Sequence, residues 1–349
     1  MKWEVRTMRS GTSFFNVTVW KKTVLRFWPI WAVGLVFWVL ALPAQGMMAL
    51  QRQLENGGDW LLSFSASVDG LGGDTALSFA VVFGLLAAMA VCSHLYSSRS
   101  ANFMGALPVR REGLFVSHYT AGLSMLLLPN IVVFLLTLLV EALGGAVMWP
   151  PLMFWLTALS GMEFFFYSFA VFCAMFTGHL LALPVFYGVL NCLAAIISAL
   201  MDSVLYLFLY GYNGLSGTTQ QAVAWLTPLE KLGGAVSWTQ AADSGAYQLA
   251  QPAVVAVYAG VGVALSAAAL LIYRARQMES AGDVVSVRVV RPIFKYGVAV
   301  CAGLSGGTFT YYVLFGDGQL SLVLSILFWA AVGYFLAEML LRKSFRVFS

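Results

Sequence analysis

Long apolar runs, separated by short polar segments, dominate the chain from residue 29 to its end. Each run is close to the roughly 20 residues that a helix needs to cross the hydrocarbon core of a bilayer. We expect membrane spans at about 29–48, 76–95, 119–143, 151–176, 181–200, 253–273, 296–315 and 320–341. This pattern predicts an all-α polytopic membrane protein with about eight transmembrane helices.

Two segments interrupt this pattern in different ways. Residues 154–200 form an almost unbroken apolar field, so the boundaries between 150 and 210 depend on the short GHLLALP connection. Residues 202–251 are the longest polar excursion, yet they mix Gly, Thr and Gln with tryptophan and leucine. Such a mixture favours short helices at or within the membrane interface over a solvated linker.

Ser13 to Trp28, before the first span, has the apolar spacing of a helix. Phe14, Val17, Val24 and Trp28 recur at helical intervals, and several basic residues lie among them. The pattern predicts an amphipathic helix on the membrane surface. A frayed basic tail is the alternative.

The basic residues indicate which ends of the spans face the cytoplasm. With about eight spans and a cytoplasmic N-terminus, 17 of the 19 Lys and Arg residues lie inside, and only Arg52 and Lys231 lie outside. Cytoplasmic loops of membrane proteins carry such an excess of Lys and Arg. We therefore expect both termini to be cytoplasmic.

Composition excludes several classes of function. Only 10% of the residues are charged, against roughly 25% in a soluble domain. The net charge of +4 is spread over the ends of apolar runs, so no nucleic-acid partner is expected.

The four cysteines lie within apolar runs without CxxC spacing, and three single histidines lie near span boundaries. Since no nucleotide-binding or hydrolase motif is present either, we expect no enzyme activity and no cofactor or metal in this chain.

The polar segment Ser97 to His118, SSRSANFMGALPVRREGLFVSH, lies between the second and third expected spans. A serine can cap a short helix here. Phe103, Met104 and Leu107 would form its apolar edge, and Pro108 would end it. The next helix would begin at Arg110 and Arg111 and continue into the membrane. Such a segment can transmit a push to a membrane helix, or its arginines can serve only to fix topology; the spacing leaves both interpretations open.

Overlapping this segment, residues 100–123, SANFMGALPVRREGLFVSHYTAGL, resemble the stretch between the second and third spans of ABC-2-type transporter permeases. LTPLEKLGGAVSW resembles the segment before that family's last core span. YRARQMESAGDVVSVRVVRPIFKYGV resembles a cytoplasmic segment of a Gram-positive bacterial subgroup with extra C-terminal spans, some of whose members extend further.

The resemblance implies a coupling helix that docks on a separate ATPase subunit. The residues it assigns to ATPase coupling are Arg99, Asn102, Phe103, Met104, Leu107, Pro108, Arg110 and Arg111. It also matches the Ser13–Trp28 helix to the family's connecting helix, and residues 211–238 to its extracellular elements. ATP and Mg²⁺ would be held by the partner, not by this chain.

The same resemblance implies partners, location and domains. We expect a dimer of ABC ATPase subunits, a second permease chain (identical or related), and lipids of a bacterial plasma membrane. The expected division is an interfacial segment at 1–28, a six-helix permease core at 29–273, and a linker with two further spans at 274–349.

A few polar residues fall inside the expected spans. Glu163 lies in the middle of the fourth span, Glu141 nearer the end of the third, and Asn130 and Asn191 are also intramembrane. Such groups are costly in a bilayer and normally face a cavity or a partner. Glu163 either lines a pathway or takes up a proton, or it is a protonated group that hydrogen-bonds between helices. Glu338, near the last boundary, has Arg342 four residues further on.

Gly303 and Gly307 form a GxxxG motif in the seventh expected span, which predicts close helix packing.

The sequence favours a permease subunit of an ATP-binding cassette transporter. A proton-coupled secondary transporter that uses Glu163 and a non-transporting scaffold or sensor subunit are the alternatives. Spans rich in Phe, Trp and Leu suit an amphipathic substrate, although they equally suit a lipid-facing surface.

Overall fold

The chain is a polytopic helical membrane protein, as the apolar pattern predicts. The computed structural model describes residues 15–56, 73–97, 100, 109–145, 147, 149–236, 238–240, 247–249, 251–275, 290–315 and 319–342. Within these residues, seven helices are long and apolar enough to cross a membrane. Contacts divide the chain into unit 1, residues 1–175 and 235–281, and unit 2, residues 176–234 and 282–349. The division expected at residues 28 and 273 stays a prediction.

Unit 1 begins with a short helix followed by a long interrupted one. The helices are α1 (Val17–Arg26), α2 (Trp28–Ala41) and α3 (Pro43–Asn56). The side chain of Asn16 caps α1 by accepting from the backbone N–H groups of Thr18 and Val19. The helix predicted over residues 13–28 is therefore present at 17–26, with its first turn fixed by Asn16; Trp28 already belongs to α2, and residues 13 and 14 lie outside the described residues.

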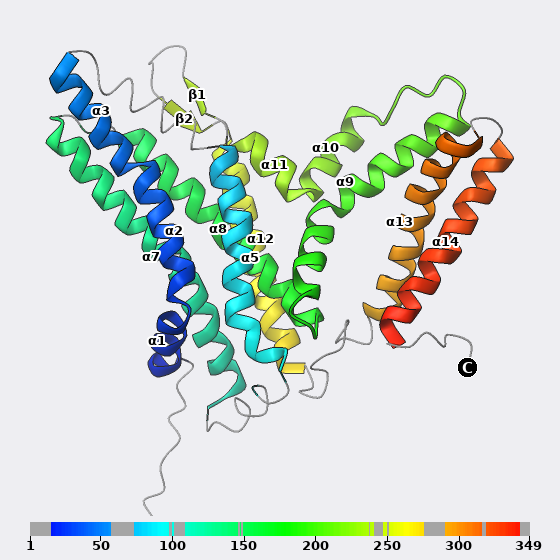
Figure 1. The fold of residues 1–349 in the computed structure, drawn as a ribbon, viewed down its shortest axis with the longest axis horizontal. Coiled ribbons are helices and arrows are strands. Elements are labelled where there is room, and N and C mark those ends of the chain that lie inside the picture. The colour runs from blue at the N-terminus through cyan, green and yellow to red at the C-terminus, as the bar shows by residue number, and fades with distance from the viewer. Residues whose placement is uncertain are drawn as a thin grey trace, which may run out of the picture. The chain divides into compact units, whose positions relative to one another are not determined.

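Among the described residues, the remaining elements of unit 1 are four long helices and a small hairpin (Figure 1). They are α5 (Asp74–Cys92), which ends in a 3-10 turn at Ser93–Leu95, α7 (Arg111–Leu143), α8 (Trp149–Phe176), β1 (Trp238–Gln240), β2 (Tyr247–Leu249) and α12 (Pro252–Ala275). The two strands pair antiparallel, with Thr239 opposite Gln248. Sequence analysis did not anticipate this hairpin.

Helix α8 forms the core of unit 1. Trp155, Met162, Phe166 and Tyr167 are almost completely buried. Gly84 on α5 allows the two backbones to approach, because a Cβ there would lie 3.0 Å from the backbone nitrogen of Tyr167. The buried face is consistent with a helix surrounded by other helices rather than by lipid.

Unit 2 contains α9 (Ala182–Phe208), α10 (Gly217–Leu226), α11 (Pro228–Ala235), α13 (Val290–Thr310), a π-helical turn at Tyr311–Phe315 and α14 (Gln319–Arg342). Helices α10 and α11 are the short helices expected between residues 202 and 251. Figure 1 shows α13 and α14 side by side along their length.

The seventh expected span, 296–315, corresponds to α13 and the π-helical turn. Helix α13 has the length of a span but is not among the seven sufficiently apolar helices. Its charged start, Arg291 and Lys295, and the small polar run at residues 305–308 lower its hydropathy. The difference from the expected eight spans therefore lies in this helix.

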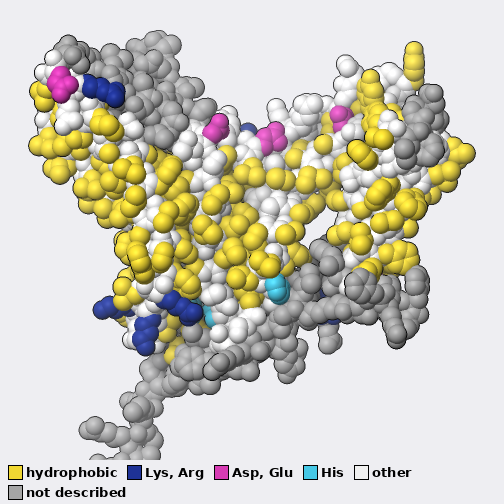
Figure 2. Space-filling view, in the orientation of Figure 1, with side chains coloured by type: hydrophobic (Ala, Val, Ile, Leu, Met, Phe, Trp, Pro, Cys, Tyr) yellow, Lys and Arg dark blue, Asp and Glu magenta, His cyan; other side chains and the backbone are white. Residues whose placement is uncertain are grey.

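The surface of unit 1 has charge at its ends. In Figure 2 apolar side chains cover its middle, and Lys and Arg side chains gather at the end where α1 lies. The exposed basic residues at that end include Lys21, Lys22, Arg26, Arg110, Arg111 and Arg274. Such a distribution is typical of a membrane protein whose charged residues mark the bilayer boundaries.

Candidate functional site

The predicted coupling segment lies only partly within the described residues. Arg99, Asn102, Phe103, Met104, Leu107 and Pro108 lie outside them. Arg110 is extended, with φ −60° and ψ 139°, and helix α7 begins at the next residue. Glu112 lies in the first turn, where a carboxylate interacts favourably with the helix dipole. The helix start predicted from Arg110 and Arg111 is therefore confirmed to within one residue.

Helix α1 is joined to the first half of α7 by three polar contacts. The backbone N–H of Asn16 donates to Oγ of Ser117 at 2.8 Å. Nε1 of Trp20 donates to Oγ of Ser124 at 3.0 Å, and Oγ1 of Thr23 lies 3.3 Å from Nδ1 of His118. These contacts recur along one face of α1, so the two helices are held in one register.

The end of α5 contacts the same part of α7 through two aromatic rings. The imidazoles of His94 and His118 are stacked, with centroids 4.6 Å apart and planes at 20°. Beside them lies a small cavity of about 10 Å³, which Cys92, Tyr119 and Tyr273 also line. This volume is at the lower limit for one water molecule. Sequence analysis treated these histidines as single boundary residues and did not predict that they meet.

Helix α12 contacts the start of α7 by an ion pair. Nη2 of Arg274 lies 2.9 Å from Oε1 of Glu112, and the rings of Phe115 and Tyr273 are 5.3 Å apart. The ion pair is partly exposed, so it contributes at most about 1 kcal/mol to stability. Together with the ring contact it fixes where α12 ends relative to α7.

Two of the polar residues predicted to lie in the membrane, Asn130 and Glu163, are in contact in unit 1. Nδ2 of Asn130 donates to Oε2 of Glu163 at 2.6 Å and lies 3.4 Å from Oγ of Ser160. Glu141 is buried further along α7, and Asn191, in unit 2, donates to the carbonyl of Tyr187 within its own helix. The structure therefore brings Glu163 and Asn130 together, whereas Glu141 lies three helical turns beyond Asn130 on α7.

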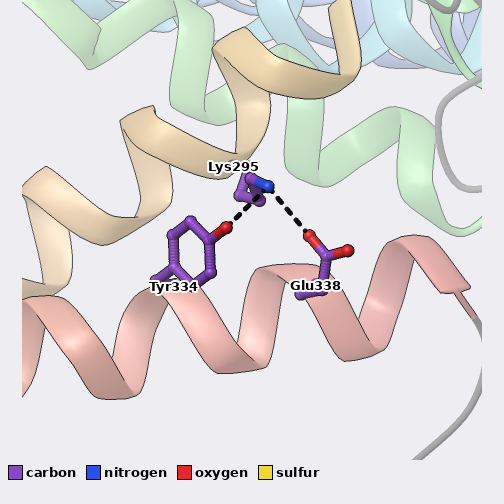
Figure 3. A network of polar contacts seen from close by, with 3 residues as sticks. All are labelled: Lys295, Tyr334 and Glu338. Carbon is purple, nitrogen blue, oxygen red and sulfur yellow. Dashed lines mark hydrogen bonds and ion pairs between the residues drawn. The ribbon is translucent and has the colours of Figure 1, made fainter. Parts of the chain in front are cut away.

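The glycines of α13 lie against α14. A Cβ on Gly303 would be 2.9 Å from Cβ of Ala330, and one on Gly307 would be 2.7 Å from Cα of Ile326. Nζ of Lys295 lies 3.1 Å from Oε2 of Glu338 and donates to the hydroxyl of Tyr334 at 2.8 Å (Figure 3). Glu338 thus has a partner on the neighbouring helix, which its spacing to Arg342 did not predict.

The described residues hold no group of three or more His, Cys, Asp or Glu side chains that could bind a metal ion. Comparisons with protein-family models, curated proteins and solved structures found no match. The site is therefore interpreted from its geometry and from the residues of the Ser97–His118 segment.

Proposed function

We propose that this chain is a membrane-spanning permease subunit of an ABC-2-type transporter, driven by a separate ATPase dimer. The observation that carries the proposal is the set of contacts around the N-terminal end of α7, which begins at Arg111. This 33-residue helix continues directly from the segment that resembles the family's coupling region. Its first turns contact α1, α5 and α12. A force applied before Arg111 would therefore reach three other elements of unit 1.

The proposed mechanism depends on helices that move as rigid bodies. ATP-driven closure of the partner ATPase dimer would push the segment before Arg110, and α7 would tilt with it. Because Trp20 and Thr23 join α1 to α7, the interfacial helix would follow. A path between two permease chains, identical or related, would then switch access from one side of a bacterial plasma membrane to the other.

The sequence contains no P-loop, which supports a transporter whose ATP and Mg²⁺ are bound by a separate partner subunit. The apolar, aromatic spans suit an amphipathic substrate. The basic end of unit 1 at α1 (Figure 2) supports a cytoplasmic location for the segment that meets the ATPase.

Co-purification from native membranes tests the proposal. We expect the full-length chain to recover a P-loop ATPase, identified by mass spectrometry. Charge reversal at Arg110, or replacement of Phe103 and Met104 by Asp, is expected to reduce this recovery at least tenfold while membrane insertion is unchanged. Arg52→Glu, the same charge change at the other end of unit 1, is the matched control and should recover the ATPase normally.

Two outcomes would overturn the proposal. One is ATPase recovery that is equal in wild type, Arg110→Glu and Arg52→Glu. The other is labelling of a cysteine at position 110 by an impermeant maleimide from outside intact cells. Transport by the purified chain without nucleotide would instead support the secondary-transporter alternative.

A further inference from the structure

Glu163 is a carboxyl group in the middle of a membrane-spanning helix. It is the fifteenth of the 28 residues of α8, and its side chain is completely buried. A charged side chain at this depth is strongly unfavourable unless a cation or water compensates it. The contacts around Glu163 therefore determine which protonation state it takes.

The surroundings of Glu163 supply hydrogen bonds but no positive charge. Oε2 accepts a hydrogen bond from Asn130, and Oε1 is buried without a hydrogen-bond partner among the described residues. Within the same residues Glu163 forms no ion pair. The protonated carboxyl is consequently the form that this site accommodates.

Three other titratable side chains on α7, α8 and α12 carry no positive charge. Tyr167, on α8, donates its phenol hydrogen to the carbonyl of Tyr119 on α7, and Tyr258 of α12 contacts the ring of Phe165. Glu141 is buried on α7, three turns beyond Asn130. None of these groups can supply a countercharge to an ionised Glu163.

Asn130 lies at a weak point of α7. Pro129 precedes it within the helix and has no N–H, so the backbone hydrogen bond to the carbonyl four residues earlier is missing. Helix bending concentrates at such positions. The Asn130–Glu163 contact therefore joins α7 to α8 where α7 deforms most easily.

We propose that Glu163 is a reversible proton-binding site whose protonated carboxyl fastens α7 to α8 through Asn130. On release, the carboxyl O–H bond breaks and the proton passes to a water molecule, which becomes hydronium. The carboxylate left behind needs hydration, so release accompanies separation of the two helices. Proton uptake reverses both events. This site does not depend on an ATPase partner.

Infrared spectroscopy of the full chain in lipid nanodiscs tests the proposal. We expect the wild type at pH 7 to show the carbonyl stretching band of one protonated carboxyl, and Glu163→Gln to lose it. Asn130→Leu should keep the band at a higher frequency, because its hydrogen bond is gone. Glu112→Gln is the matched control and should remove carboxylate bands instead, since Glu112 pairs with Arg274.

Exchange into D₂O separates a reversible site from a static hydrogen bond. We expect the carboxyl band to shift as its proton exchanges, and to shift at least tenfold faster in Asn130→Leu. Two results would overturn the proposal. One is a wild-type carboxyl band that stays unshifted in D₂O for days. The other is a Glu163→Gln spectrum that differs from the wild-type spectrum only by the loss of carboxylate bands. If Glu163→Gln does not fold, dicyclohexylcarbodiimide labelling of the wild type replaces it. That reagent modifies protonated carboxyls, so peptide mapping must find Glu163 labelled and Glu112 unlabelled.

Discussion

Nζ of Lys295 lies 3.1 Å from Oε2 of Glu338, and this ion pair joins the first turns of α13 to the last turns of α14. Both side chains are mostly buried, with exposed fractions of 19% and 13%. The hydroxyl of Tyr334 accepts a second hydrogen bond from the same ammonium group, whose nitrogen is 4.5 Å from the ring centroid (Figure 3).

Breaking this pair should destabilise the α13–α14 hairpin. We expect Lys295→Met to lower the free energy of unfolding, because the mostly buried Glu338 carboxylate loses the ammonium group of Lys295. The double variant Lys295→Met/Glu338→Leu should recover most of the loss. Chemical unfolding in detergent measures both, and Tyr334→Phe, which removes only one hydrogen bond, should cost about 1 kcal/mol. Equal losses in the single and double variants would contradict the pairing.

The glycines of α13 predict a second, sterically controlled effect. In Gly307→Ala the new Cβ would lie 2.5 Å from Cγ1 and 2.7 Å from Cα of Ile326, so the helices must separate. We expect a loss of about 1–3 kcal/mol in unfolding free energy. Gly297→Ala, on the same helix, meets no atom within 4 Å and should be neutral or stabilising by up to about 1 kcal/mol. Equal changes in unfolding free energy for Gly307→Ala and Gly297→Ala would contradict this prediction.

Local sequence patterns predicted the helices well, because each helix depends on residues that are close together in the sequence. The start of α7 followed from Arg110 and Arg111, and α1 from apolar spacing near Trp28. The span prediction agreed less well with the structure at α13, because small polar residues interrupt its apolar run. The β1–β2 hairpin was missed because Trp238–Gln240 and Tyr247–Leu249 are too short to show alternation.

Contacts between helices could not be predicted from a single sequence, because they depend on the register of one helix against another. Glu163 and Asn130 were each singled out by their polarity, yet nothing in the sequence paired them. Lys295 precedes an apolar run and reads as a boundary residue, so its bond to Glu338 had no local signal. The stacked rings of His94 and His118 are a further case, since the two residues flank the whole polar segment.

The attachment of α1 to α7 makes a prediction about local dynamics. Trp20→Phe combined with Thr23→Val removes two side-chain contacts, to Ser124 and His118; Thr23→Val keeps the side-chain volume, and Trp20→Phe keeps an aromatic ring. Each hydrogen bond contributes about 1 kcal/mol, so amide hydrogen exchange in α1 should accelerate roughly tenfold or more. Thr18→Val, on the exposed face of α1, is the control and should leave exchange unchanged. Unchanged exchange in the double variant would mean that apolar contacts alone hold α1.

Gly122, on α7, lies beside the buried phenol of Tyr167 on α8. A Cβ at this position would overlap the Tyr167 hydroxyl and would lie 2.6 Å from Cζ of that ring. Gly122→Ala should therefore displace the ring and break the 2.9 Å hydrogen bond from Tyr167 to the carbonyl of Tyr119. Because the ring is completely buried and cannot move into solvent, we expect a loss of about 2–4 kcal/mol, larger than the overpacking cost alone.

The companion variant Gly122→Ala/Tyr167→Phe separates the two causes of that loss. Removing the hydroxyl relieves the closest overlap, although the ring must still shift away from the new methyl group and the carbonyl of Tyr119 loses this donor, so only part of the stability should return. Thermal unfolding in detergent, compared with Gly188→Ala, which meets no atom within 4 Å, measures the difference. A Gly122→Ala protein as stable as Gly188→Ala would show that α7 and α8 are further apart than this contact requires, which would also weaken the Asn130–Glu163 bond between the same two helices.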